Sequence, residues 1–151
     1  MIVVSDSTTL IILFDLNRLD LLQNLFQKIY IPNKVHEEIT YKEDISIPEF
    51  IEIVEVDKSE ILKYLEFYLD EGESEAISLA LERELPLIID EKKGRKIAKN
   101  LGIKIVGLLG IIYLNIQKGF ITKKEAKELL ETAVKNGYRI SEKLIKEVLE
   151  R

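Results

Sequence analysis

The stretch that decides the fold is MIVVSDSTTLIILF, residues 1–14. The β-branched residues at 2–4 are typical of a buried strand, whereas the apolar residues that follow Ser7 fit a helix. Asp6 stands between them, at the point where the chain leaves the strand. It has two interpretations. It can cap the helix that follows, a contact worth about 1 kcal/mol, or it can belong to a ligand site at the end of the strand.

The same change from strand to helix recurs along the chain. Strands are predicted at 2–5, 28–32, 50–56, 85–90 and 103–107, with helices between them and two more helices at the end. The segment 50–56 alternates apolar and acidic residues, which predicts a half-exposed or edge strand. Short strands joined by helices favour a parallel sheet covered on both faces. We therefore predict an α/β fold: a three-layer α/β/α sandwich with a central parallel sheet.

Length and composition set the class of protein. The 151 residues are expected to form a single domain, with a core over 1–120 and a C-terminal helical extension over 121–151. A hydrophobic share of 46% and a charged share of 32% fit a folded globular chain. The N-terminus lacks the basic region of a signal peptide, and the longest apolar run, 105–114, is too short to span a bilayer. A cytoplasmic protein without membrane attachment is expected.

Composition also limits the chemistry. The chain has no Cys and one His, which excludes disulfides, thiolate zinc sites and a Cys nucleophile, and disfavours a Ser-His-Asp triad. Catalysis would therefore depend on carboxylates, hydroxyls, Lys or Arg. The net charge of −5 argues against a protein that coats nucleic acid nonspecifically.

Three further acids occupy positions comparable to that of Asp6. Asp90 ends the strand 85–90, where the alternative is a cap for the helix that begins at Glu91. Glu38 flanks the inward face of the helix 33–40, and Glu73 lies at the centre of the inward face of the helix 73–84. Each of them taken alone also fits an ordinary capping or surface acid.

Convergence of the four acids would have a chemical consequence. Two unit charges about 4 Å apart repel by roughly 4 kcal/mol at an effective dielectric constant near 20. Such a cluster persists when protons or a cation neutralise it. Oxygen-only ligands select hard ions, Mg²⁺ or Mn²⁺, and these ions commonly serve phosphate chemistry.

Four stretches in order carry a family resemblance: VVSDSTTLIIL (3–13), IPNKVHEEI (31–39), GESEAISLA (72–80) and LPLIIDEKKGRKIAKNLGIKIVGLLGII (85–112). Together they resemble PIN-domain ribonucleases, in particular the prokaryotic branch related to the VapC-type toxins of toxin–antitoxin pairs. The match covers about residues 1–120, and the tail NGYRISEKLIKEVL resembles the end of that branch. The resemblance implies metal-dependent cleavage of single-stranded RNA by a metal-activated water. It also implies a homodimer and a small antitoxin protein as partner.

Residue roles follow from the resemblance. It implies that Asp6, Glu38, Glu73 and Asp90 are the catalytic, metal-binding acids. Glu73 stands where many PIN nucleases carry Asp, and Glu91 is expected to share or replace the metal-binding role of Asp90.

The resemblance also covers the hydroxyl residues after the first acid, while the basic stretch after Asp90 indicates phosphate contacts by its own composition. Ser7 and Thr8 match the hydroxyl residues after the first acid, and one of them is expected to orient Asp6 or a metal-bound water. Lys92 and Arg95 are expected to grip RNA phosphates, since Arg binds phosphate bidentately; the alternative for this basic stretch is a solvated helix face.

Two other functions fit parts of the pattern. A noncatalytic PIN-like module with a degenerate site would bind RNA or protein without turnover, and the departures at Glu73 and Glu91 keep this alternative open. A flavodoxin-like or receiver-type domain would need an acid pair at the end of the first strand, where the sequence offers Asp6 alone.

Overall fold

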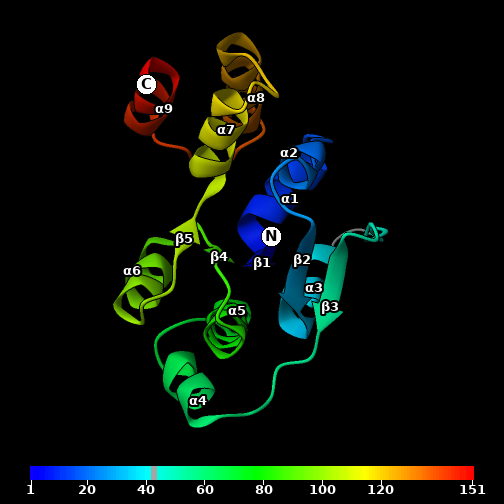
Figure 1. Ribbon diagram of the computed structural model, residues 1–151, viewed down its shortest axis with the longest axis vertical. Coiled ribbons are helices and arrows are strands. Elements are labelled where there is room, and N and C mark those ends of the chain that lie inside the picture. Colours follow the sequence, from blue (N-terminus) through cyan, green and yellow to red (C-terminus); the bar gives the residue numbers. More distant parts are fainter. Residues whose placement is uncertain (42–43) are drawn as a thin grey trace.

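The centre of the protein is a five-stranded parallel sheet, seen in a computed structural model that describes residues 1–41 and 44–151 (Figure 1). Its strand order is β3-β2-β1-β4-β5, and every neighbouring pair is parallel. The bounds are β1 Ile2–Ser5, β2 Lys28–Pro32, β3 Ile51–Val54, β4 Leu87–Ile88 and β5 Ile105–Val106. The predicted fold class is confirmed, and β3 is an edge strand, in agreement with its alternating sequence.

Helices cover both faces of the sheet. In Figure 1, α1, α2 and α7 to α9 lie above the sheet and α4 and α5 lie below it, while α3 and α6 pack against α5. The helix bounds are α1 Ser7–Asp15, α2 Asp20–Gln23, α3 Asn33–Thr40, α4 Glu60–Glu66, α5 Glu71–Arg83, α6 Lys92–Asn100, α7 Leu108–Gln117, α8 Lys123–Lys135 and α9 Glu142–Glu150.

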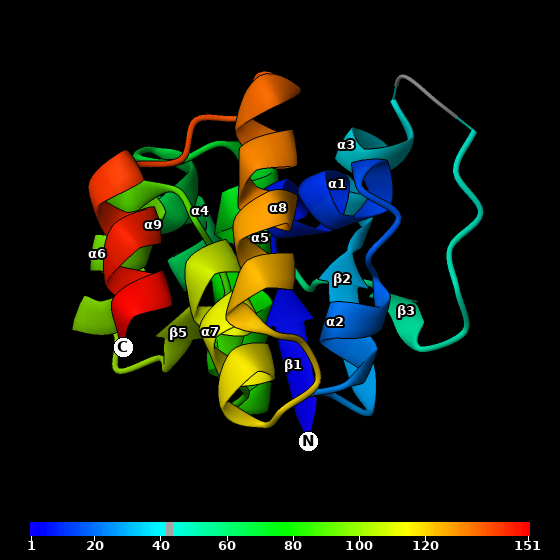
Figure 2. The same ribbon diagram turned by 90° about the horizontal axis from the view of Figure 1, so that it is seen from above.

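The core is aliphatic and continuous. Val3 and Val4 of β1 are completely buried, as are Leu87 and Ile88 of β4 beside them. Strands buried on both faces need such uninterrupted apolar runs, which explains why β1 and β4 carry no alternating polar residues. The C-terminal helices pack on α7 (Figure 2). Ala126, Leu130 and Ala133 of α8 are buried in the same core, so this helix turns an apolar face inward.

The two central strands bring Asp6 next to the end of β4. Val4 pairs with Leu87 and Ser5 with Ile88, and the backbone N–H of Asp6 donates to the Ile88 carbonyl over 2.9 Å. The central strands therefore end together, and the residues that follow them share one edge of the sheet. Among the described residues, no helix is long and apolar enough to cross a membrane.

Candidate active site at the carboxyl edge of the sheet

Asp6 is buried without a full set of partners. Its side chain is 4% exposed, and its Oδ1 atom has no hydrogen-bond partner. It occupies the N-cap position of α1, yet it forms no side-chain capping bond. The pKa of the Asp6 carboxyl is raised to about 7. Burial is the main cause, the charges of Glu38, Asp70 and Asp90 add to the rise, and a hydrogen bond from the Ser7 backbone opposes it. The simple capping interpretation therefore does not explain this residue.

Glu38 reaches across from α3 to the first turn of α5. Its Oε2 accepts a hydrogen bond of 2.9 Å from the Ser7 hydroxyl, and a Cβ built on Gly72 would lie 1.7 Å from its Oε1. Gly72 thus leaves the space that the Glu38 carboxylate occupies. The side chain is exposed overall, but partial burial of its charged end raises the pKa, with Asp70 adding to the rise and the Ser7 hydrogen bond opposing it.

Glu73 and Asp70 meet at the start of α5. The Oδ1 atom of Asp70 caps this helix by accepting from the Glu73 backbone N–H over 2.8 Å. The pKa of the Glu73 carboxyl is raised to about 8, chiefly by half-burial and in part by the charges of Asp70, Asp6 and Glu91. On the α6 side, a Cβ on Gly94 would lie 3.4 Å from Glu73 Oε2.

Asp70 is an acid that the sequence interpretation missed. The sequence pattern predicts a helix from residue 73, whereas α5 begins at Glu71 with Asp70 as its cap. The signal was present, because an Asx or hydroxyl residue followed three positions later by Glu is typical of a helix N-terminus.

Asp90 is held by two elements that are distant in sequence. It accepts a short hydrogen bond from the buried Thr9 hydroxyl of α1, and its Oδ1 accepts from the Leu108 backbone N–H over 3.0 Å. Asp90 therefore satisfies an end group of α7, not of the helix after Glu91 that the capping alternative expected. A Cβ on Gly107 would lie 2.7 Å from Asp90 Oδ1, so glycine permits this approach.

The hydroxyl groups that follow Asp6 donate hydrogen bonds to two different acids. Ser7 holds Glu38 and Thr9 holds Asp90, whereas Thr8 is exposed. The Ser7 hydroxyl donates to Glu38, so it does not orient Asp6. That Ser7 or Thr8 orients a metal-bound water stays a prediction. A helix turns about 100° per residue, so the side chains at positions 7 and 9 face the sheet edge from two sides while position 8 faces solvent.

The start of α6 carries Glu91 and the basic residues that were expected to bind phosphate. Glu91 is exposed at the N-cap position of α6, and Lys92 is exposed beside it. Arg95 is half-buried, and its Nη1 donates to the Ile89 carbonyl over 2.8 Å, so part of the guanidinium already serves the backbone. Lys93 extends toward α4, where its Nζ lies 5.8 Å from the centre of the Tyr68 ring.

The structure thus gathers acids from four separate parts of the chain at one edge. We refer to this set as the acidic edge: Asp6, Glu38, Asp70, Glu73, Asp90 and Glu91. Over residues 1–41 and 44–151, none of these six forms an ion pair with Lys, Arg or His. The raised pKa values of Asp6 and Glu73 are what uncompensated negative charge in a partly buried place produces.

The acidic edge offers only carboxylate oxygens, which suit a hard divalent cation that binds few protein ligands and keeps several waters. Within the described part of the chain, no three acidic side chains are grouped closely enough to hold a metal ion together. Mg²⁺, however, usually keeps several waters and binds through one or two carboxylates. The unpartnered Oδ1 atom of Asp6 is an acceptor of this kind.

Comparisons with known proteins place the chain in a family. A family model described as DUF3368, PIN domain, matches residues 2–151. No curated protein matches. A similar solved structure is a PilT N-terminus domain protein from the hyperthermophilic archaeon Sulfolobus solfataricus P2, with 18% identity and a TM-score of 0.48 over 93% of this chain and 100% of that one. On the family match, the chain belongs to the DUF3368 family of PIN domains, which are generally nucleases.

Proposed function

We propose that this protein is a divalent-metal-dependent endoribonuclease that cleaves single-stranded RNA, with Mg²⁺ or Mn²⁺ bound at the acidic edge. The observation that carries the proposal is Asp6, buried with an unpartnered oxygen and a pKa near 7 among other acids. Membership of a PIN-domain family supports a nuclease, and the all-oxygen donor set supports a hard cation.

The position of each acid suggests whether it would bind the metal ion or orient a bound water. When bound, the ion would lower the pKa of a water and offset charge on the reacting phosphate. Asp6 would hold the ion directly, with Glu73 as the second carboxylate because its pKa responds to the charge of Asp6. Glu38 and Asp90 would orient bound waters, since Ser7 and Thr9 fix their carboxylates. Glu91 would add a further oxygen ligand from the start of α6.

Substrate contacts are proposed on the α6 side of the acidic edge. Lys92 is exposed there, and the donors of Arg95 that do not bind Ile89 would contact RNA phosphates. The exposed Thr8 hydroxyl is available to the same strand. These local cations would offset the overall charge of −5 where a phosphate backbone approaches.

The biological setting rests on the resemblance of the ordered motifs. We propose a VapC-like cytoplasmic toxin that forms a homodimer and is neutralised by a small antitoxin protein. Exposed apolar side chains on α4 and the C-terminal helices offer surface for such contacts: Tyr64, Phe67, Val134 and Leu144 are 44–86% exposed.

The test combines cleavage and metal binding. The wild-type chain and Asp6→Asn are incubated with a mixed panel of single-stranded RNAs in Mn²⁺, in Mg²⁺ and in chelator. Asp57→Asn, which changes an exposed acid that is not one of the acidic edge, is the control. We expect metal-dependent cleavage by the wild type and the control, and none by Asp6→Asn. Thermal unfolding should show a gain of about 2.7 kcal/mol at metal 100-fold above its dissociation constant, lost in Asp6→Asn.

The noncatalytic alternative has an observation in its favour. Glu38 and Asp90 are already engaged in hydrogen bonds, and the described acids form no ready three-ligand cluster. Stabilisation of the wild type by metal without turnover of any RNA would support a binding module. Cleavage that Asp6→Asn retains in full would refute the nuclease site.

A further inference from the structure

A groove runs between α8 and α9, the last two helices of the chain. Its volume is about 560 Å³, and residues of these two helices alone line it. Figure 2 shows the helices running in opposite directions, and they contact each other. No residue of the acidic edge lines the groove, so it is a separate surface from the candidate active site.

The floor of the groove is apolar and only partly covered. Val134 of α8 is 44% exposed there, and Ile145 and Leu149 of α9 are half-buried. No residue of α9 is buried, so the apolar stripe of this helix is incompletely shielded by its own chain. Apolar surface left open to water between charged rims is typical of an interaction site.

The rims of the groove carry charges in a regular pattern. Each rim is one stripe of a helix with three exposed charges at intervals of four residues: Lys127, Glu131 and Lys135 on α8, and Glu142, Lys146 and Glu150 on α9. Residues four positions apart lie on the same face of a helix. The α8 rim therefore reads plus-minus-plus, and the α9 rim reads minus-plus-minus.

The two rims do not pair with each other within one chain. In the part of the chain that the structure describes, the ion pairs among these charges lie along single helices: Lys127 with Glu131 and Lys146 with Glu150, both at 3.9 Å. Exposed pairs of this kind contribute little to stability, so they are readily exchanged for contacts with a partner. The groove thus stays open between two rims of matching spacing and opposite sign.

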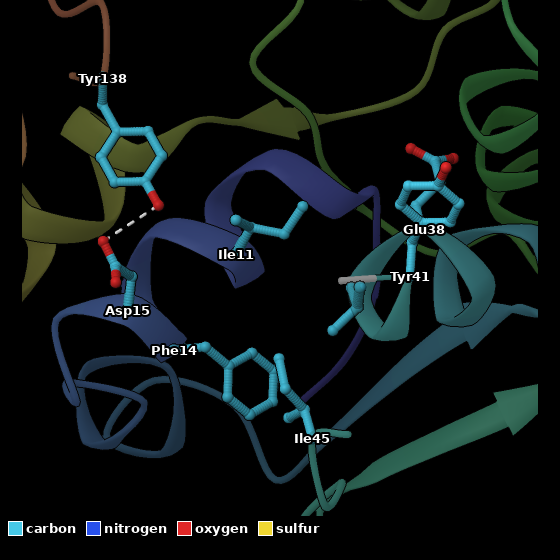
Figure 3. Close-up of a pocket in the computed structure, with 8 residues that line it drawn as sticks. Ile11, Phe14, Asp15, Glu38, Tyr41, Ile45 and Tyr138 are labelled. Atoms are coloured by element: carbon cyan, nitrogen blue, oxygen red, sulfur yellow. Dashed lines mark hydrogen bonds between the residues drawn. The ribbon is translucent and has the colours of Figure 1, made fainter. Parts of the chain in front are cut away.

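The connection between the two helices is held against the body of the protein. The Tyr138 hydroxyl donates to the Oδ2 atom of Asp15 on α1 over 3.1 Å (Figure 3), and the Asn136 side-chain amide donates to the same atom over 3.4 Å. A partner would therefore meet a surface that is already in place, which lowers the entropic cost of binding.

We propose that this groove is the interface of a symmetric homodimer, in which α8 of each copy packs against α9 of the other. The charge pattern selects this arrangement, since each rim reads the same from both ends. Placing α8 against the partner's α8 would oppose like charges at every level, and so would α9 against α9. Placing α8 against α9 opposes unlike charges at all three levels, whether the two helices run parallel or antiparallel.

A homodimer is part of the proposed function, and this inference names the surface that forms it. The first experiment is sedimentation equilibrium of the full chain over a range of micromolar concentrations. Low ionic strength is used because salt screens exposed charge pairs. We expect a dimer with a micromolar dissociation constant, because helices of 13 and 9 residues offer a small interface.

The central charges give the sharpest test, since Glu131 faces the partner's Lys146 in either direction of the helices. Glu131→Lys and Lys146→Glu should each weaken the dimer by roughly tenfold or more, because two-fold symmetry introduces the repulsion twice. An equimolar mixture of the two variants should dimerise like the wild type, because unlike charges then meet at both contacts. Glu128→Lys and Lys143→Glu reverse exposed charges of the same helices outside the groove and should change nothing.

The mixing experiment separates contacts between chains from contacts within one chain. Each variant alone keeps its altered intrachain charges in the mixture, so recovery of the dimer there reports only on the interface. Circular dichroism establishes that both variants are folded before they are mixed. A mixture of folded variants that stays monomeric overturns the proposal.

Two other results would also overturn it. A wild-type chain that remains monomeric leaves the groove to a helix of another protein, and a dimer that both charge reversals leave intact has its interface elsewhere. RNA cleavage is measured on the same samples, because the groove contains none of the proposed active-site residues. A dimer without cleavage would contradict the nuclease proposal alone, and a cleaving monomer would contradict the interface alone.

Discussion

Removing the charge of Asp6 should change how the stability of the metal-free protein depends on pH. On folding, the pKa of this carboxyl rises from 3.8 to about 7, chiefly through burial. The folded state therefore binds the proton more tightly than the unfolded state does. Stability is higher at low pH and falls as the pH rises from about 4 to about 7, because the unfolded state then loses this proton while the folded state keeps it. Asp6→Asn removes this dependence.

The magnitude follows from the two pKa values. Each tenfold difference in proton affinity is worth about 1.4 kcal/mol. Above pH 7, ionised Asp6 lowers the free energy of unfolding by about 4 kcal/mol, and at pH 5 by only about 1.5 kcal/mol. The advantage of Asp6→Asn over the wild type should thus grow by about 3 kcal/mol between pH 5 and pH 8. Since the charge of Asp6 also raises the pKa of Glu73, its removal acts in the same direction there.

The assay is urea or thermal unfolding of both proteins in chelator at several pH values, followed by circular dichroism. A difference of about 3 kcal/mol corresponds to roughly 6–12 °C in Tm for a chain of this length. Comparing the two proteins at each pH cancels the titration of all the other groups that do not contact Asp6. An advantage that stays constant from pH 5 to pH 8 would refute the claim that Asp6 is a buried, uncompensated carboxylate.

Two further substitutions separate structure from function at the same edge. Thr9→Val removes the buried donor to Asp90 and leaves that carboxylate oxygen unpartnered, so the free energy of unfolding should fall by about 1–3 kcal/mol in a urea titration, with an unchanged value counting against the contact. Gly72→Ala places a methyl group where Glu38 Oε1 lies. The flexible Glu38 side chain should move away from Ser7, so RNA cleavage should fall while stability stays equal or rises by up to about 1 kcal/mol from the helix preference of Ala; full cleavage by this variant would show that the position of Glu38 does not matter.

Local sequence patterns were enough for the architecture. The β-branched run before Asp6 and the apolar residues of 85–89 predict strands buried on both faces, and such strands require helices on either side. The alternation in 50–56 predicts a half-exposed or edge strand, and β3 is an edge strand, where Glu52 faces solvent. Periodicity depends on residues a few positions apart, so the sequence displays it directly.

Candidate acids were predictable only in part. Asp6 and Asp90 stand out because parallel strands end at a common edge, and helical spacing places Glu38 and Glu73 on inward faces. Asp70 was missed, although its spacing to Glu73 is typical of a helix start. For these residues the sequence indicates position along an element and which side of it a side chain occupies.

Which groups meet depends on the packing of the whole chain. The parallel α/β sandwich and the acids at its strand ends are predictable from the sequence, since both follow from neighbours within one element. That Thr9 rather than Thr8 serves an acid, that Asp90 binds the start of α7 and that Gly72 makes room for Glu38 depend on contacts between residues 18 to 81 positions apart. Such contacts are set by how whole elements pack, and no local spacing encodes the distance between two side chains on different elements.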